Sequence, residues 1–228
     1  MYKRIGKRLF DIFSSSLALV FLTPILLCTA YLVRKKLGSP VLFAQIRPGK
    51  DNRLFRMYKF RSMTNECDSD GKLLPDDVRL TSFGKKLRET SLDELPELIN
   101  IIKGDMSVVG PRPQLVRDMV FFSEKEMKRQ SVYPGLTGLA QISGRNNITW
   151  EEKFRYDLEY VNNISFWEDM RIIYRTIFKV TNKEDINTEG MGTAEDYGDY
   201  LLRSNMITRE EYDAEHVKAD CLIKRCNI

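Results

Sequence analysis

Hydrophobic and polar positions divide the chain into an apolar N-terminal segment and a longer, mixed remainder. The stretch Ile12–Val33 contains no charged residue, and about 20 apolar residues are enough to cross the hydrocarbon core of a bilayer. Basic residues flank this stretch on both sides, namely Lys3, Arg4, Lys7 and Arg8 before it and Arg34, Lys35 and Lys36 after it. We therefore predict that residues 1–36 form a membrane-embedded helical segment.

Two topologies fit this segment. A spanning helix should have more Lys and Arg on its cytoplasmic side, whereas these two flanks are about equally basic. Thr23-Pro24 lies in the middle of the stretch, where Pro24 removes a backbone hydrogen bond and Thr23 can bond back to the carbonyl of Leu19. These features favour a re-entrant helix-break-helix with both ends on one face. A plain transmembrane helix remains the alternative, because Pro-kinked spanning helices are common.

Residues 37–186 are interpreted as one small globular domain. Two β-like stretches, Val41–Gln45 and Leu54–Phe60, enclose a turn that contains Pro48 and Gly49, and this arrangement predicts a short β-hairpin. We expect an α+β fold, mainly helical, in which the N-terminal membrane segment packs on a cytoplasmic domain with this hairpin.

Residues 187–228 form a C-terminal extension. Glycines near its start indicate a loose linker, and Asp199–Asn205 and Thr208–Asp220 have the character of two short helices. The second helix would begin with a capping box, Thr208-x-x-Glu211. Two interpretations stay open, a short helical hairpin for oligomer or partner contact and a marginally ordered tail.

Composition narrows the class of protein. The chain has 228 residues, of which 43% are hydrophobic and 30% charged, as is usual for a folded domain. A net charge of +4 is too small to indicate nucleic-acid binding by itself, so we predict no nucleic-acid partner. The 4 cysteines are scattered and there is 1 histidine, which gives neither a disulfide framework nor a zinc motif and favours a reducing compartment.

Asp93 and Glu94 precede an amphipathic stretch that ends at Gly104, so they lie at the start of a predicted helix. A structural interpretation of the pair is strong, because Ser91-x-x-Glu94 is a capping box and acidic residues suit the positive end of a helix. Pro96 also fits the first turn of such a helix. Local pattern alone favours a structural role over a catalytic one.

Basic residues around the acidic pair favour phosphate chemistry instead. Arg88 lies just upstream, and Arg112 lies between two prolines that fix the backbone and so aim its guanidinium group at a phosphate. Lys59 and Arg61 share one face of the second hairpin strand and alone would be interpreted as a solvated edge. Arg145 lies in a glycine turn that could present backbone N–H groups to a phosphate. Together these cations suit a diphosphate substrate.

Six stretches of the chain match, in order, the motifs of a known family. They are KRLFDI, QIRPG, MYKFRSMT, SLDELPELINIIKGDMSVVGPRP, YPGLTGLAQISGRN and WEEKFRYDLEYVNNISFWEDMRII. On these motifs the chain, from about Lys7 to Lys179, resembles the small monotopic phosphoglycosyl transferases, also called the bacterial sugar transferase family. The long central motif, which contains Asp93 and Glu94, is the most specific.

The resemblance implies an enzyme that transfers a phospho-sugar from a UDP-sugar to polyprenyl (undecaprenyl) phosphate and releases UMP. It implies Mg²⁺ as a cofactor and a covalent phospho-sugar intermediate on Asp93, which would also be a metal ligand, with Glu94 as its acidic partner. It also implies a re-entrant helix broken at a Ser-Pro or similar pair, here Thr23-Pro24. The further residues that match family positions and become substrate-binding candidates are Lys59, Arg61, Arg88, Arg112, Arg145, Asp157 and Asp169.

A membrane-bound acceptor would explain the membrane segment, because a polyprenyl phosphate keeps its tail in the bilayer and its phosphate at headgroup level. We therefore expect the bacterial cytoplasmic (inner) membrane, with the active site on its cytoplasmic face. A homo-oligomer or contact with downstream glycosyltransferases would fit this step of glycoconjugate assembly. Two alternatives stay open, a catalytically inactive membrane-anchored scaffold and a membrane-bound phosphohydrolase. The sequence does not identify the sugar.

Overall fold

The structure is a computed structural model, and it describes residues 2–144, 148–182 and 195–226. Short π- or 3-10 helices are labelled η. In chain order, the described elements are η1 (Tyr2–Gly6), α1 (Lys7–Leu37), β1 (Leu42–Pro48), η2 (Lys50–Asn52), β2 (Leu54–Phe60), α2 (Asp76–Arg79), α3 (Ser82–Glu89), η3 (Leu92–Glu94), α4 (Glu97–Lys103), β3 (Ser107–Val109), α5 (Val116–Met119), α6 (Glu124–Met127), η4 (Lys128–Ser131), β4 (Gly135–Thr137), α7 (Leu139–Ser143), α8 (Trp150–Asn162), α9 (Phe166–Asn182), α10 (Tyr197–Arg203) and α11 (Arg209–Arg225).

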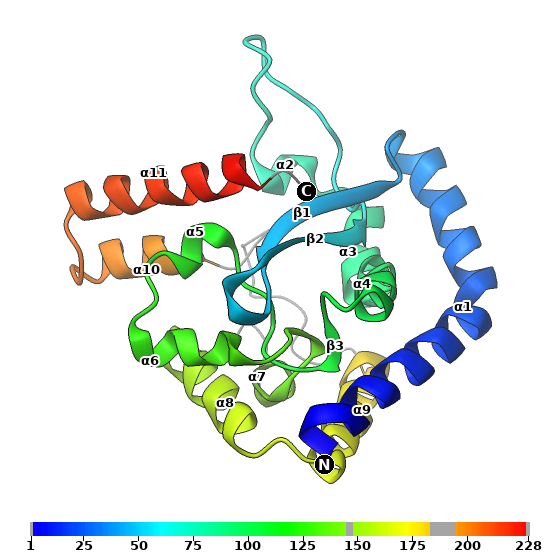
Figure 1. Cartoon of the computed structure of the whole chain (residues 1–228). Coiled ribbons are helices and arrows are strands. Elements are labelled where there is room, and N and C mark those ends of the chain that lie inside the picture. Colours follow the sequence, from blue (N-terminus) through cyan, green and yellow to red (C-terminus); the bar gives the residue numbers. More distant parts are fainter. Residues whose placement is uncertain (1, 145–147, 183–194, 227–228) are drawn as a thin grey trace.

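The N-terminal helix α1 is continuous across Thr23-Pro24. The Thr23 hydroxyl donates to the Leu19 carbonyl at 2.6 Å, as predicted. Pro24 removes one backbone hydrogen bond, and a long helix accommodates this loss by bending. Figure 1 shows α1 changing direction along its length without interruption. The predicted helix-break-helix is therefore corrected to a single bent helix.

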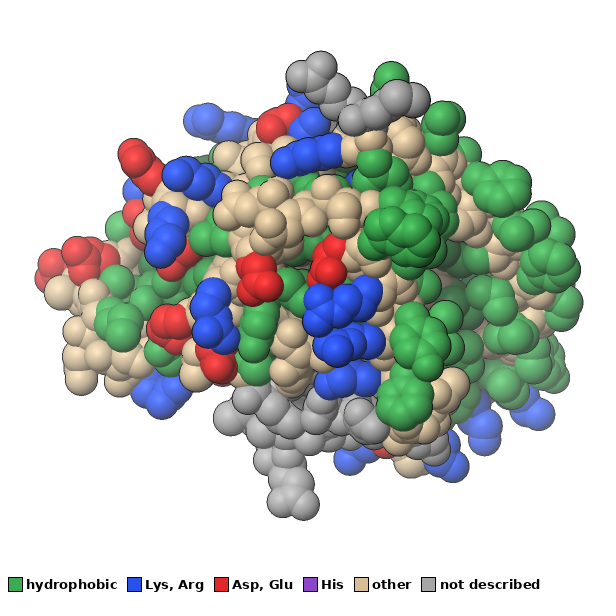
Figure 2. Space-filling view, turned by 90° about the horizontal axis from the view of Figure 1, so that it is seen from below, with side chains coloured by type: hydrophobic (Ala, Val, Ile, Leu, Met, Phe, Trp, Pro, Cys, Tyr) green, Lys and Arg blue, Asp and Glu red, His purple; other side chains and the backbone are tan. Residues whose placement is uncertain are grey.

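One face of α1 packs against the globular domain. Its buried residues form two groups near its ends, and within each group they recur every four positions, as expected for one side of a helix. They are Asp11 and Ser15 near the start and Thr29, Val33 and Leu37 near the end. The Asp11 carboxylate accepts a hydrogen bond from the backbone N–H of Val108 at 3.0 Å. The opposite face of α1 is apolar and exposed, and Figure 2 shows hydrophobic side chains crowded on the side of the molecule where α1 lies.

Hydrogen bonds attach both ends of α1 to the same globular unit. Near its start, the Lys7 ammonium donates to Asp169 at 2.7 Å, and the Arg8 guanidinium donates to two carbonyls at the end of α4. Beyond its end, Arg61 donates to the carbonyl of Ser39 at 2.7 Å. Because α1 is held at both ends and along one face, it lies along the domain rather than leading away from it.

The predicted hairpin is confirmed, since β1 and β2 pair in antiparallel fashion along their whole length. Strand β1 continues to Pro48, beyond its predicted end at Gln45, because the proline falls at the end of an edge strand where its missing N–H costs little. The turn is therefore displaced to residues 49–53. Asp51 and Asn52 adopt positive φ there, a conformation that these side chains tolerate well.

A second sheet consists of β3 and β4, which pair in parallel. The sequence pattern did not predict it, because strands of 3 residues are too short to show an alternating pattern. Between the two sheets lies α4, whose Leu98 and Ile101 pack with Phe55, Met57 and Met106. Residues of α1 pack against this same cluster, so the N-terminal helix contributes to the core of the domain.

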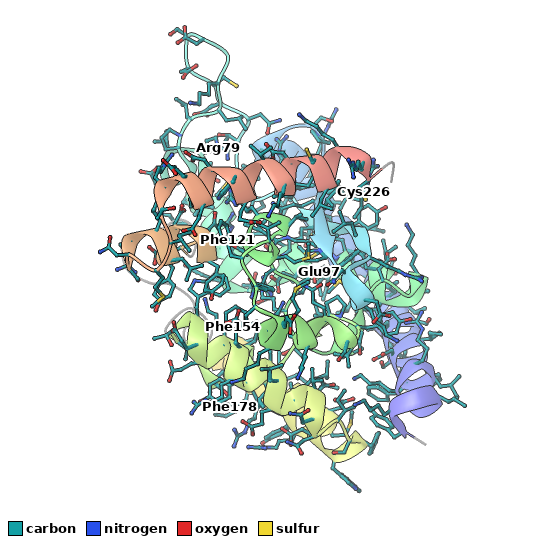
Figure 3. All side chains as sticks on the ribbon, turned by 60° about the vertical axis from the view of Figure 1, so that its left-hand side comes forward. Arg79, Glu97, Phe121, Phe154, Phe178 and Cys226 are labelled. Atoms are coloured by element: carbon teal, nitrogen blue, oxygen red, sulfur yellow. The ribbon has the colours of Figure 1, made fainter. Side chains whose placement is uncertain are left out.

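The C-terminal extension contains both predicted helices. Helix α10 begins at Tyr197, slightly before its predicted start, and α11 continues to Arg225. The predicted capping box at Thr208 is present. Tyr197 and Leu201 of α10 pack with Trp150 and Phe154 of α8. Figure 3 shows Phe121 between α11 and α8, the helix that carries Phe154. The described part of the extension therefore belongs to the packed domain.

Asn100 joins α4 to the hairpin, and its substitution tests the packing of these elements. It is fully buried, its Oδ1 accepts from the N–H of Tyr58 at 3.0 Å, and its Nδ2 donates to the Arg56 carbonyl at 2.6 Å. Asn100→Ala should lower the free energy of unfolding by about 2 to 3 kcal/mol, because two backbone groups of β2 lose their partner and a fully buried side chain is truncated. Thermal unfolding in detergent should show a melting temperature lower by about 5 to 10 °C.

The control is Asn162→Ala, at an exposed position on α8, which should change stability by less than about 0.5 kcal/mol. Equal melting temperatures for the two variants would mean that Asn100 does not hold the hairpin to α4.

Candidate active site

A cleft of about 690 Å³ brings together residues that are far apart in the sequence. Seven of the predicted site residues line it, namely Lys59, Arg61, Arg88, Asp93, Glu94, Arg112 and Asp157. Asp169 lies elsewhere, and Arg145 is outside the described residues. The hairpin, η3 and the loop after β3 form the end of the cleft that contains the acidic pair.

Asp93 and Glu94 lie on the short 3-10 turn η3, just before α4, rather than on its first turn. The predicted capping box is wrong, because Ser91 has φ of 53° and its side chain makes no capping hydrogen bond. Pro96 is the N-cap of α4 and so separates the helix from this turn. Neighbouring residues on a 3-10 helix point about 120° apart, so the two carboxylates can have different environments.

Glu94 is at the centre of an ion cluster. Its Oε1 lies 2.8 Å from the Lys59 ammonium and 2.6 Å from Nη2 of Arg112. Burial alone would raise the pKa of Glu94, but Arg112 and Lys59 outweigh burial and hold that pKa well below its usual range. Glu94 is therefore ionised, and it holds two cations in fixed positions at the cleft.

Asp93 has a different environment from its neighbour. The residue is only 7% exposed, yet its carboxylate makes no hydrogen bond or ion pair with any residue that the structure describes. Burial, followed by the charge of Glu94, raises the pKa of Asp93 to about 6, while Lys59, Arg88 and Arg112 act in the opposite direction. Asp93 is thus a carboxylate near three cations that is still available to a ligand.

Glu97 belongs to the same cluster, although the sequence analysis did not single it out. It is 1% exposed, and its Oε1 lies 3.2 Å from the Lys59 ammonium. Burial raises the pKa of Glu97 to about 7, with Lys59 opposing the rise and Glu94 adding to it. Figure 3 shows Glu97 in the interior of the molecule. An acidic residue in a first helical turn looks like an ordinary complement to the helix dipole, which conceals its burial.

Backbone contacts fix the loop that carries Arg112. The N–H of Gly110 donates to the Thr137 carbonyl at 2.9 Å, and the N–H of Gly135 donates to the Pro111 carbonyl at 3.0 Å. A side chain at Gly135 would not fit, because its Cβ would lie 2.1 Å from the Gly110 nitrogen. These close approaches, together with the prolines, aim the Arg112 guanidinium at Glu94.

Arg61 and Arg88 form the wall of the cleft next to Asp93. Helix α3 positions Arg88, whose Nε donates to the Ser62 hydroxyl at 3.0 Å. Gly84 permits this packing, since a Cβ at that position would lie 1.8 Å from the Ser62 carbonyl oxygen. Arg61 donates to the Ser39 carbonyl and so links this wall to the end of α1.

Asp157 lines the cleft, but Arg129 occupies its carboxylate. Nε and Nη2 of Arg129 donate to Asp157 Oδ2 at 2.8 and 2.7 Å, and both side chains are almost fully buried. The Arg129 Nη2 also donates to the carbonyl of Arg112 at 2.6 Å. Asp157 and Arg129 thus support the Arg112 loop from behind, and the substrate contact expected of Asp157, which lines the cleft, stays a prediction.

Asp169, on α9, lies beside the start of α1 and outside the cleft. It is fully buried and accepts hydrogen bonds from the Tyr2 hydroxyl at 2.5 Å, the Lys7 ammonium at 2.7 Å and the Tyr160 hydroxyl at 2.7 Å. A carboxylate enclosed in this way cannot also contact a ligand in the cleft. The prediction of Asp169 as a substrate contact is therefore corrected to a role in attaching the N-terminal segment.

Several further cleft residues were not singled out from the sequence as site residues. They are spread over β1, α7, α8 and the start of the extension, and include Arg47, Gln141, Lys153, Glu195 and Asp196. Arg47 lies within the matched stretch QIRPG, which was the available signal for it. The two acidic residues lie beyond every matched stretch, so the motifs gave no signal for them.

Comparisons with known proteins agree with the motifs. A family model described as bacterial sugar transferase matches residues 2–183. An uncharacterized sugar transferase, EpsL, of Bacillus subtilis is 50% identical over 189 residues, which are 83% of this chain and 94% of that protein.

Two relatives with named activities are longer proteins. The UDP-glucose:undecaprenyl-phosphate glucose-1-phosphate transferase of Klebsiella pneumoniae is 44% identical over 76% of this chain and 39% of its own length. The UDP-N-acetylgalactosamine-undecaprenyl-phosphate N-acetylgalactosaminephosphotransferase of Aeromonas hydrophila is 38% identical over 75% of this chain and 42% of its own length. The chain thus spans about two fifths of each of these relatives.

The Arg129–Asp157 pair can be tested by stability. Asp157→Asn leaves a buried guanidinium without its counter-charge, so we expect the free energy of unfolding to fall by about 3 to 5 kcal/mol. Glu168→Gln is the matched control, because Glu168 pairs with Arg171 at the surface and such pairs contribute about 0 to 1 kcal/mol. Thermal unfolding of both variants measures the difference, and a loss no larger at position 157 than at position 168 would contradict the bracing role.

Proposed function

The chain belongs to the bacterial sugar transferase family, and from this membership we propose that it transfers a phospho-sugar from a UDP-sugar to undecaprenyl phosphate. The products would be undecaprenyl-diphospho-sugar and UMP. Relatives whose names give this type of reaction support the proposal, and they match about three quarters of the chain. The reaction would be an early membrane step of glycoconjugate assembly.

The unpaired carboxylate of Asp93 is the observation that carries the proposal. Its neighbour Glu94 already binds Lys59 and Arg112, so these cations stay in place whether or not a substrate is present. With a pKa of about 6, Asp93 is mostly ionised at neutral pH and can act as a nucleophile. A role in helix capping would instead require bonds to backbone N–H groups, and the structure shows none at this side chain among its described residues.

The transfer takes place in two half-reactions. An oxygen of the Asp93 carboxylate attacks the phosphorus that carries the sugar, and the bond from this phosphorus to the bridging oxygen breaks. UMP leaves with the bridging oxygen. An oxygen of undecaprenyl phosphate then attacks the same phosphorus, and the bond to Asp93 breaks, which restores the carboxylate.

Like charges oppose both half-reactions, because an anionic group attacks a phosphate. Two unit charges 4 Å apart repel by about 4 kcal/mol at an effective dielectric constant of 20. Arg88, Arg112 and Lys59 lie close enough to influence the pKa of Asp93, so they can offset this repulsion. Since Glu94 and the loop backbone hold two of them, little reorganisation is needed during the reaction.

Mg²⁺ is the cofactor that we propose, held by Asp93 and the phosphates of the donor. Within the described ranges no group of three or more His, Cys, Asp and Glu side chains could hold a metal ion. This fits an ion that arrives with its substrate, because Mg²⁺ is usually bound through one or two carboxylates plus substrate phosphates. When bound, the ion would supply positive charge to the diphosphate.

The position of the cleft suits a lipid acceptor. Among the described helices, α1 has the length and apolar character needed to cross a membrane. Phe60 lines the cleft and packs with Val33 and Leu37 at the end of α1, so one end of the cleft borders the membrane helix. A phosphate at headgroup level can therefore approach Asp93 from this end. Attachment of both ends of α1 to one domain supports a re-entrant arrangement on the cytoplasmic face.

An acceptor-free reaction tests the nucleophile. Purified protein mixed with UDP-sugar and Mg²⁺ should release about one UMP per active site and gain one phospho-sugar, which mass spectrometry should place on Asp93. Asp93→Asn should release none, because an amide is not a nucleophile for this step. Asp77→Asn, at an exposed position near the cleft, is the matched control and should behave like the wild type.

The same experiment separates the alternatives. Addition of undecaprenyl phosphate should give a lipid-linked product, whereas a phosphohydrolase would give free sugar phosphate and a scaffold would give no turnover. Phospho-sugar attached to another residue, or an unaltered burst of UMP in Asp93→Asn, would disprove the proposed nucleophile.

Removal of the metal ion gives a further prediction. Chelation should abolish UMP release, and added Mg²⁺ should restore it, because the charge on the diphosphate is then offset. The melting temperature of the donor-free protein should not change with chelation, since the described residues provide no closed metal cage. A large loss of stability on chelation would instead indicate a structural metal and contradict an ion that arrives with the donor.

A further inference from the structure

The cleft continues from Asp93 to the start of the C-terminal extension, where Glu195 and Asp196 line it. The family model ends at residue 183, so this part of the cleft wall lies outside the region that the model covers. It is firmly attached, because Ala219 of α11 is 1% exposed and packs with Val116 and Met119 of α5. Within the described residues 195–226, the extension is thus a fixed wall of the cleft.

Local bonds hold Asp196 in place. One carboxylate oxygen, Oδ2, lies 2.5 Å from Nη2 of Arg117, and the N–H of the next residue, Tyr197, donates to Asp118 at 2.9 Å. Asp196 is the N-cap residue of α10, but its side chain makes no capping hydrogen bond. Its second oxygen, Oδ1, has no hydrogen-bond partner within the described ranges. A carboxylate oxygen in this situation can accept hydrogen bonds from a ligand.

Two cations in this part of the cleft lack an acidic partner within the described ranges. The Lys153 ammonium lies 4.3 Å from the ring centroid of Trp150, and burial lowers the pKa of Lys153. Arg47 donates to the Gln45 side chain and to the Pro113 carbonyl, and burial, followed by the nearby Arg112, lowers its pKa to about 10. Cations that remain without an acidic partner in a cleft are suited to bind a phosphate.

An amide side chain adds an unused acceptor. Nε2 of Gln141 donates to the Leu136 carbonyl at 3.1 Å, whereas its Oε1 is buried and has no partner. A buried polar atom without a partner is costly, and the hydroxyl of a ligand would relieve this cost. The cleft that the extension lines therefore combines unused hydrogen-bond acceptors with unused positive charge.

We propose that Asp196 and Gln141, beside Lys153, form a subsite for a hydroxyl-bearing ring that is carried on a phosphate of the donor. The inference rests on the proposed function, because a UDP-sugar contains two such rings, the ribose and the transferred sugar. Figure 1 shows α10 and α11 across the molecule from α1, so this subsite lies away from the membrane helix and suits the water-soluble donor rather than the lipid. The extension would thus set the affinity for the donor. Through its contacts with that ring, it would also set the selectivity among donors.

The test is equilibrium binding of UDP-sugar to the full chain in detergent with Mg²⁺, measured by titration calorimetry. Asp93→Asn is added to every protein compared, because this change should stop UMP release and leave binding as the only event. The variant is Asp196→Asn, which keeps a favourable N-cap residue and so should fold. Its dissociation constant should be about tenfold higher than that of the wild type, because hydrogen bonds to a charged acceptor contribute about 1.5 to 3 kcal/mol. Asp220→Asn, the same change at an exposed position of the extension, should bind like the wild type.

UMP identifies which ring occupies the subsite. If the ring is the ribose, Asp196→Asn should weaken the binding of UMP and of UDP-sugar by similar factors. If the ring is the transferred sugar, UMP binding should stay at the wild-type value while UDP-sugar binding weakens. Either result supports the subsite.

Unchanged binding of both ligands in a folded Asp196→Asn protein would overturn the inference. Should that variant have a lowered melting temperature, Asp196→Glu keeps the charge but moves the carboxylate, and wild-type binding in this variant as well would overturn the inference. The proposed function fails separately, if the wild type binds UDP-sugar but releases no UMP. A wild type that binds neither ligand would reject both proposals.

Discussion

The ion cluster around Glu94 is the interaction on which the site depends. Its carboxylate is shared by Lys59, from β2, and Arg112, from the loop after β3, so three separate elements must be in place together. Burial of a charge costs free energy of desolvation, and pairing of opposite charges in this way offsets that cost. Because Glu94 takes these two cations, the adjacent Asp93 keeps a free carboxylate that is buried near Lys59, Arg88 and Arg112. Structural and chemical roles are thus divided between two neighbouring acidic residues.

Local patterns predicted much of the fold. The hairpin, the helices of the extension and the capping box at Thr208 depend on nearby residues, and the structure contains all of them. The sequence pattern failed where distant contacts decide. Ser91 does not cap a helix, because a positive φ and Pro96 separate η3 from α4. The bend without a break in α1 likewise depends on the packing of the whole helix against the domain.

The candidate site shows the same division. Motifs identified seven residues that line the cleft. A motif predicts which positions matter, but it does not predict which groups the side chains at those positions contact. Asp157 and Asp169 match family positions equally well, yet one braces a loop from behind and the other holds the N-terminal segment. The burial of Glu97 beside Lys59 was not predicted, because an acidic residue in a first helical turn is ordinarily exposed. Asp196 reaches the cleft only because the extension folds back onto α5 and α8.

The packing of α1 has a practical consequence for anyone who works with this enzyme. Ala18, Leu19 and Leu22 pack against the cluster under the hairpin, and Val33 and Leu37 belong to the cluster beside α3. Deleting the helix to obtain a water-soluble fragment would therefore uncover two apolar clusters and release the segment that Arg61 ties to the cleft. Helix α1 and the globular domain form one folding unit. The detergent or lipid that surrounds α1 during purification will therefore affect whether the cleft stays intact.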